Sequence, residues 1–276
     1  MKKKFTGNML LHILLIVYVV VTLAPLVIVF SSSFRSINNM SSNLKLFSEF
    51  KFDSYISAFT RMNFPVVFMN SFLTTAGSVI IVVLIASMAA YPISRIKNKK
   101  SRFLYYFFIA GLVVPSQMVI IPIAQMFNHL NIPYNRFTPM IMFITCSLPF
   151  STFLYAGFMG SVPISIEESA YIDGSGLFRR YFSIVFPLLK PATISVIITQ
   201  GIWIWNDYFF PMVFITKSNQ YSLPVAMIQF LGDRENPAQW NVLFASCILC
   251  ALPLVALFLA FQKQFVNGVA AGAVKG

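Results

Sequence analysis

Six long apolar stretches divide this chain, and they constrain its fold more than any other feature of the sequence. Each holds roughly 20 or more mostly apolar residues, the length an α-helix needs to cross the hydrocarbon core of a bilayer. They are Met9–Phe30, Asn70–Ser94, Phe103–Phe127, Thr138–Met159, Pro191–Ile215 and Asn241–Gln262. An α-helix satisfies its own backbone hydrogen bonds in lipid, so we expect an all-α membrane protein with six transmembrane helices.

The composition supports a membrane protein. Hydrophobic residues make up 58% of the chain and charged residues 10%, whereas a soluble domain carries about 25% charged residues. The formal net charge of +12 could suggest a nucleic-acid partner, but the basic residues are scattered between apolar stretches and form no stripe along one soluble face. We therefore expect no nucleic acid and take the basic residues as markers of membrane topology.

Two of the six stretches need comment. Basic residues followed by Met9–Phe30 could form a signal peptide, but no small-x-small cleavage site follows before Phe34, so we expect an uncleaved helix. The polar segment Ser31–Met69 is then a folded or interfacial loop. Pro115 and Pro122 interrupt the third stretch, and we expect them to kink its helix.

The distribution of Lys and Arg predicts the orientation, because cytoplasmic connections carry the excess of both. With the N-terminus inside, the inner connections hold more basic residues than the outer ones. The strongest contribution is a cluster between the second and third stretches: Arg95, Lys97, Lys99, Lys100 and Arg102. Both termini and the loop between the fourth and fifth stretches are then cytoplasmic.

That cytoplasmic loop, Val162–Lys190, carries several of the few carboxylates of the chain. Ser165 and Glu168 fit a capping box with serine at the N-cap and glutamate at N3. Asp173 and Gly174 should end this helix, because glycine takes the left-handed conformation that a C-cap needs. A helix of about two turns is marginal in water, so we expect a protein groove to hold it.

The rest of the loop, Ser175–Phe186, has polar residues at helical spacing on one face and apolar residues on the other. This pattern is typical of an amphipathic helix on a membrane surface. Pro187 and Pro191 then set the turn back into the bilayer. An ordinary solvated loop is the alternative.

The stretch EESAYIDGSG followed by IVFPLLKP resembles the EAA loop of bacterial ABC-importer permeases. Ser169 and Ser175 stand where that family usually has alanine. Four other segments resemble its carbohydrate-uptake branch, and in particular the shorter maltose-type permease. They are Asn70-Ser71, AAYPISR, Trp205-Asn206-Asp207-Tyr208 and the tail FVNGVAAGAVKG. The residues that match the EAA pattern are Glu168, Ala170, Asp173, Gly174, Pro187 and Pro191.

The resemblance implies a type I permease fold with both termini cytoplasmic. It implies an N-terminal helix and extracytoplasmic loop over residues 1–69, a permease core over 70–262 with a coupling loop at 162–190, and a cytoplasmic tail over 263–276. The implied partners are a second permease, two ATPase subunits, an extracytoplasmic solute-binding protein, a sugar and membrane lipid. No cofactor or metal is implied, and the chain is not itself an enzyme.

The resemblance also implies functional residues. The loop would act as the coupling helix that docks in an ATPase cleft, and the tail would also reach the ATPase subunits. The implied coupling residues are Glu167, Glu168, Ser169, Ala170, Asp173, Gly174 and Ser175. The implied tail contacts are Gly272, Ala273, Val274, Lys275 and Gly276.

Asp207 is the only Asp, Glu, Lys or Arg within the six stretches. A charge at membrane depth is costly and should face the bundle interior or a wet cavity. With Trp205 and Asn206 it could line a sugar pathway, or it could be an anchor at the membrane interface, where aromatic residues collect.

Other function classes are open but less well supported. The sequence has no GxxxxGK[ST] phosphate-binding loop, so energy must come from a partner or an ion gradient. A gradient-driven carrier or a channel is the main alternative, although one acidic residue is little for a proton relay. A scaffold would not need the capped loop, and an enzyme would need a nucleophile or metal cluster. Cys247 and Cys250 have C-x-x-C spacing without a second pair, and we take them as core residues.

Overall fold

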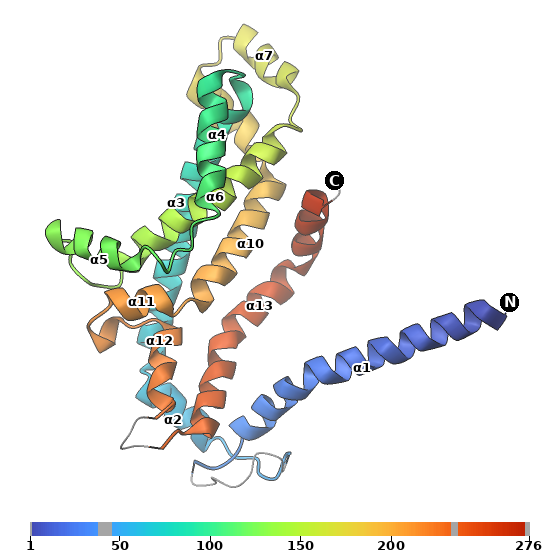
Figure 1. Cartoon of the computed structure of the whole chain (residues 1–276), viewed down its shortest axis with the longest axis vertical. Coiled ribbons are helices and arrows are strands. Elements are labelled where there is room, and N and C mark those ends of the chain that lie inside the picture. The colour runs from blue at the N-terminus through green and yellow to red at the C-terminus, as the bar shows by residue number, and fades with distance from the viewer. Residues whose placement is uncertain (1, 38–45, 233–236, 274–276) are drawn as a thin grey trace. The chain divides into compact units, whose positions relative to one another are not determined.

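The computed structural model describes residues 2–37, 46–232 and 237–273, with side chains for residues 9, 11–37, 46–232 and 237–259. Every regular element in these ranges is a helix, as expected (Figure 1). The chain divides into two compact units, residues 1–65 with 226–253, and residues 66–225 with 254–276. Each is described by itself.

The first unit contains α1 (Lys2–Ser33), α2 (Asp53–Arg61), the 3₁₀ turn η3 (Ile228–Phe230) and the first part of α13 (Trp240–Ala273). The side chains of residues 11–27 on α1 are all exposed, although nearly all of them are apolar. A lone helix with this composition is stable in lipid and not in water. The exposed surface of α1 therefore indicates contact with the bilayer.

The segment after α1 is more ordered than a plain polar loop. Phe34 stacks on Phe50 with ring centroids 4.3 Å apart, and the Ser33 and Tyr55 hydroxyls lie 2.8 Å apart. Arg61, at the end of α2, lies over the ring of Phe230 at 5.0 Å. Thus the segment expected as a folded or interfacial loop carries a helix of its own and an aromatic cluster.

The second unit is a helix bundle in which α6 (Thr138–Met159) packs against α4 (Lys99–Gly111), α10 (Lys190–Asn206) and α11 (Phe209–Phe214). The long helix α3 (Phe64–Arg95) contributes Val82, Ala86 and Ala90 to the core. These positions lie four residues apart and form one buried stripe. The remaining elements are α5 (Ile120–His129), α7 (Ile164–Ile172), α8 (Leu177–Arg180), the π-helix η1 (Tyr181–Val185), α9 (Phe186–Leu188), η2 (Ser218–Gln220) and α12 (Leu223–Met227).

Four helices are long and apolar enough to cross a membrane within the described ranges, and a bent helix pair raises the number to five. The four are Leu11–Ser33, Phe64–Arg95, Thr138–Met159 and Trp240–Leu259. They match four of the six expected stretches. The second begins at Phe64, ahead of the expected Asn70.

The prediction of one kinked helix over the third stretch was wrong. The chain forms α4 and α5, and residues 112–119 between them are turns and bends. Pro115 has no amide hydrogen to donate, and its ring disfavours the helical conformation at Val114. The helix therefore ends at Gly111, before the proline, instead of bending at it.

The fifth stretch is also interrupted. The helix α10 ends at Asn206, and α11 begins at Phe209 after two intervening residues. At its other end α10 meets the segment Leu177–Leu188 at an angle of 73°. This bend lies at Leu189, between Pro187 and Pro191, as expected from these prolines.

Candidate functional site

The candidate site is the short helix α7 with the turn that follows it. Pro163 precedes α7 with φ −60° and ψ 131°, and no side chain caps the helix. The predicted capping box was therefore wrong, because Ser165 and Glu168 already lie inside the helix. Proline has a fixed φ suited to a helix start, and here it sets the first residue of α7 two positions earlier than expected.

The end of α7 agrees with the prediction from Asp173 and Gly174. Asp173 is the C-cap, and Gly174 has a φ of 79°. The amide of Gly174 donates to the Tyr171 carbonyl at 3.0 Å, and the amide of Ser175 donates to the Ala170 carbonyl at 2.9 Å. Together these two bonds form a Schellman motif, which satisfies carbonyls that a helix end otherwise leaves unpaired.

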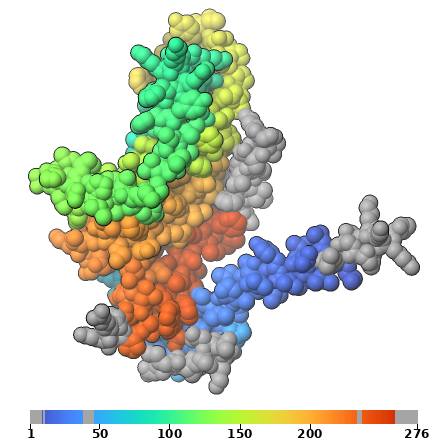
Figure 2. Space-filling model, viewed as in Figure 1, coloured from blue at the N-terminus to red at the C-terminus, as the bar shows by residue number. Residues whose placement is uncertain are grey.

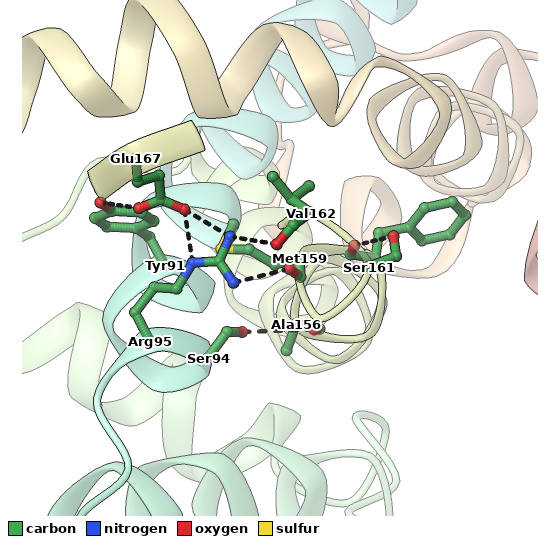
Figure 3. A network of polar contacts seen from close by, with 9 residues as sticks. Tyr91, Ser94, Arg95, Ala156, Met159, Ser161, Val162 and Glu167 are labelled. Carbon is green, nitrogen blue, oxygen red and sulfur yellow. Dashed lines mark hydrogen bonds and ion pairs between the residues drawn. The ribbon is translucent and has the colours of Figure 1, made fainter. Parts of the chain in front are cut away.

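A buried ion pair attaches α7 to the end of α3 (Figure 3). The Arg95 side chain donates through Nε to Glu167 Oε1 at 2.7 Å, and its Nη2 lies 2.6 Å from the same oxygen. The Tyr91 hydroxyl donates to Glu167 Oε2 at 2.6 Å. Both oxygens of the carboxylate are thus bonded, and the exposed fractions of the Arg95 and Glu167 side chains are only 13% and 7%.

The same guanidinium also holds the end of α6. Arg95 Nη1 donates to the Met159 carbonyl at 3.2 Å, and Nη2 donates to the Val162 carbonyl at 3.1 Å. Carbonyls at a helix C-terminus carry partial negative charge, and a cation there is favourable. Arg95 therefore joins three segments in one polar network: the ends of α3 and α6, and the start of α7 (Figure 3).

A second contact ties the segment after α7 to α3. The hydroxyl groups of Tyr181 and Ser87 lie 2.6 Å apart, and the ring centroids of Tyr181 and Tyr91 lie 5.3 Å apart. Tyr181 begins the π-helix η1, an element that often marks functional positions. Both helical parts of the loop, α7 and η1, therefore contact α3.

The expected coupling residues divide into two sets. Glu167 and Ala170 are buried and face the protein. Glu168, Ser169, Asp173 and Gly174 are exposed, and Ser175 is half-buried. The outer face of α7 also carries two large apolar side chains, Tyr171 and Ile172, with exposed fractions of 67% and 84%.

Several of these residues could not be identified as site residues from the sequence. Tyr171 and Ile172 lie within the EAA-like stretch, but a motif does not show which face is open. Tyr91 and Arg95 lie about 70 residues before Glu167, at separations of 76 and 72 positions. The one signal in the sequence was Arg95 at the end of AAYPISR, where its charge indicated only the cytoplasmic side of the membrane.

The second helix of the loop is partly as expected. Tyr181 and Val185 are buried, but Phe178 and Phe182 of the same predicted apolar face are exposed. The Arg180 guanidinium lies 4.9 Å from the ring centroid of Tyr171, which links α8 back to α7. The side chains of this segment thus lie partly in the protein core and partly on the surface.

The residues Trp205, Asn206 and Asp207 lie at the break between α10 and α11 and do not converge on one point. Asp207 Oδ2 accepts a hydrogen bond from the Phe210 amide at 3.0 Å, so it caps α11. Trp205 is buried with its ring 5.9 Å from that of Phe68, whereas Asn206 is exposed and donates to the Ile202 carbonyl.

The expected tail contacts fall partly outside the described residues. The backbone of Gly272 and Ala273 belongs to α13, and Val274, Lys275 and Gly276 lie outside the described residues.

Comparison with known proteins gives a consistent set of similarities. Residues 81–270 match the family model described as "Binding-protein-dependent transport system inner membrane component". The chain is 32% identical over 276 residues to the "Probable starch degradation products transport system permease protein AmyC" of Thermoanaerobacterium thermosulfurigenes, covering 100% of both chains. It is 31% identical over 253 residues to the melibiose/raffinose/stachyose import permease protein MelC of Bacillus subtilis, covering 91% of each.

A solved structure is similar as well. It is the crystal structure of a bacterial ABC transporter involved in the import of the acidic polysaccharide alginate. The similarity has a TM-score of 0.83 at 21% identity and covers 96% of this chain and 98% of the other. At this identity the comparison supports the fold alone.

Proposed function

The chain belongs to the family of binding-protein-dependent transport system inner membrane components, and on this premise we propose that it is the permease subunit of an ATP-driven importer for a sugar or oligosaccharide. It is a multi-pass protein of the bacterial cell membrane. The sugar class rests on the relatives, whose names specify starch degradation products and melibiose, raffinose and stachyose.

The proposed topology is a type I permease fold with six spans and both termini in the cytoplasm. Four long helices supply four of the spans. The segments α4 to α5 and α10 to α11 supply the other two as broken spans. The basic cluster between α3 and α4 supports the orientation, because Lys and Arg are retained on the cytoplasmic side. The proposed parts remain residues 1–69, the core 70–262 and the tail 263–276.

The proposed coupling element is α7, which docks in a cleft of an ATPase subunit. The observation that carries this proposal is the contrast between its two faces. Glu167 and Ala170 anchor the inner face to the protein, and Ile172 leaves 84% of its surface exposed on the outer face. An apolar side chain outside the bilayer favours a protein contact. Glu168, Ser169, Asp173, Gly174 and Ser175 complete the contact surface.

The network around Arg95 gives this docking a mechanical consequence. A force on α7 reaches α3 and the end of α6 through the buried Glu167 carboxylate, without passing through a flexible linker. Closure of the ATPase subunits around ATP would therefore move two helices of the bundle together with α7. Movement of packed helices between two arrangements is a known basis for switching.

The other proposed partners complete the transporter. They are a second permease, a second ATPase subunit and an extracytoplasmic solute-binding protein, within membrane lipid. ATP hydrolysis belongs to the ATPase subunits. The tail residues 272–276 are proposed to reach the ATPase pair, and Trp205, Asn206 and Asp207 are proposed to line the sugar pathway.

The energy source of sugar uptake tests the proposed function directly. Cells that express the transporter should take up a labelled oligosaccharide, and deletion of the ATPase subunit should abolish uptake. An uncoupler applied while ATP is maintained should leave uptake unchanged. Uptake that survives the deletion and is lost with the uncoupler would identify a gradient-driven carrier and refute the proposal.

A further inference from the structure

A cavity of about 710 Å³ lies where α3 turns into α4, on the side of α6. Its wall includes the turn residues Ile96, Lys97 and Asn98, together with Gly157 of α6 and Gly160 just after it. The lining also contains Lys99, Ser101, Arg102 and Tyr105 of α4. The function proposed above makes no use of this cavity.

The cavity is lined by cations without counterions. Lys97, Lys99 and Arg102 are all exposed, and the lining contains no carboxylate. Within the described residues, none of these three side chains forms an ion pair with a carboxylate. Such a site favours an anion with several oxygen acceptors.

An apolar surface continues from this basic cavity along α4. The exposed fractions of Phe103 and Phe107 are 68% and 65%, and their rings stack with centroids 6.4 Å apart. Leu104 and Tyr106 beside them are also exposed. The surface of α4 is uncovered in Figure 2, where it forms much of the green part of the molecule. A ligand that fits both parts has an anionic head and long apolar chains.

We propose that this cavity binds the headgroup of an anionic phospholipid such as phosphatidylglycerol, with its acyl chains along α4. Basic pockets between membrane helices on the cytoplasmic side are suited to anionic headgroups. The proposal rests on the proposed function only for the cytoplasmic orientation of the α3–α4 turn. The turn begins directly after Arg95, so the bound lipid would stabilise the segment that positions the coupling helix.

The test measures lipid retention by the assembled transporter. Native mass spectrometry would count the phosphatidylglycerol molecules retained after extraction from vesicles of phosphatidylglycerol and phosphatidylcholine. The triple variant Lys97→Gln, Lys99→Gln, Arg102→Gln should lose one retained phosphatidylglycerol. Each basic residue near such a headgroup contributes about fivefold in affinity, so three contribute roughly a hundredfold. Lys100→Gln is the matched control, because Lys100 is exposed on α4 but does not line the cavity.

A second variant fills the cavity and keeps its charge. A Cβ atom at Gly157 meets nothing within 4 Å, so Gly157→Leu should fold and occupy the headgroup volume. It should also lose the retained lipid. Gly201→Leu on α10 is the control, since a Cβ there likewise meets nothing within 4 Å and Gly201 lies outside the cavity.

Three outcomes would overturn the proposal: equal retention in the triple variant and the wild type, equal retention in Gly157→Leu, or displacement of the lipid by inorganic phosphate at matched ionic strength. The last would assign the site to a free anion. ATP-linked uptake is measured on the same samples. Normal uptake with unchanged lipid retention would reject the lipid site and leave the proposed function intact.

Discussion

At the scale of single residues, Glu167 anchors α7 to the protein and Gly174 forms the turn that ends it. The Glu167 carboxylate has both oxygens bonded inside the protein, to Arg95 and Tyr91. Gly174 has a φ of 79°, which an L-residue with a Cβ rarely adopts. Both residues therefore position the helix, and the exposed residues between them remain available to a partner.

The Arg95–Glu167 pair predicts strongly non-additive variants. Removing one partner leaves an uncompensated buried charge, which costs about 3–5 kcal/mol. Arg95→Leu and Glu167→Leu should each lower the thermal unfolding temperature of the purified transporter markedly. The double variant should be less destabilised than the sum of the two, because neither charge remains. Strictly additive effects would show that the two side chains do not interact.

Two neighbouring glycines test the helix end. Gly174→Ala should destabilise the turn by about 1–2 kcal/mol, since the cost of a left-handed residue is of this size. A Cβ at Gly174 meets nothing within 4 Å, so the cost is conformational and not steric. Gly176→Ala is the matched control, because Gly176 has a φ of −66° and equal space. Coupled ATP hydrolysis and unfolding temperature should both change only in Gly174→Ala; a similar loss in Gly176→Ala would refute the assignment of the turn.

At the scale of elements, the broken helices matter most to function. Asp207 accepts a hydrogen bond from the Phe210 amide at the start of α11, so it holds the break after α10 in place. The Asp207 carboxylate therefore has a structural role, in addition to the role in the sugar pathway that we propose for its charge. The sequence indicated that a charge lies in the fifth stretch, and the structure adds that the helix is interrupted there.

Asp207→Asn and Asp207→Ala separate these two roles. Asparagine keeps an oxygen acceptor for the Phe210 amide, so stability should be near that of the wild type, whereas alanine should cost about 1 kcal/mol as a lost cap. If Asp207 lines the sugar pathway, both variants should raise the KM for uptake about 10-fold or more, because hydrogen bonds to charged groups contribute about 1.5–3 kcal/mol. An unchanged KM in Asp207→Asn would remove the residue from the pathway.

Elements that depend on local sequence were predicted well. Four of the apolar stretches became long helices although each contains a proline, and the glycine at position 174 ended α7 as expected. The predictions of a kinked third helix and of a capping box at Ser165 failed because a proline nearby had the larger effect. Pro115 ended α4 where a kink was expected, and Pro163 moved the start of α7 away from Ser165. In both cases a residue with fixed φ outweighed the weaker signals of hydropathy and capping.

The candidate site was predictable only in part. The motif identified the stretch of chain but not its buried face, because burial of Glu167 depends on Arg95, 72 positions earlier. Tyr171 and Ile172 became candidates only when their exposed surface was known. Long-range pairs of this kind have no local signal in a single sequence.

At the scale of the whole molecule, we propose that α7 is a cytoplasmic helix that transmits ATPase movement to the membrane bundle. The family, the permease fold and the internal bracing of α7 all fit this role. Ala170 is buried, so a contact with a partner should be sought at Ile172.

The most direct measurement is therefore cross-linking from position 172. The three native cysteines would be replaced by alanine, and Ile172→Cys or Val113→Cys introduced into the assembled transporter in membrane vesicles. Val113 has a similar exposed fraction, 79% against 84%, but lies after α4. A maleimide–benzophenone reagent attached to position 172, and not to position 113, should photo-cross-link to the ATPase subunit, and ATP should change the yield. No cross-link from position 172, or its labelling from the extracytoplasmic side, would contradict the account.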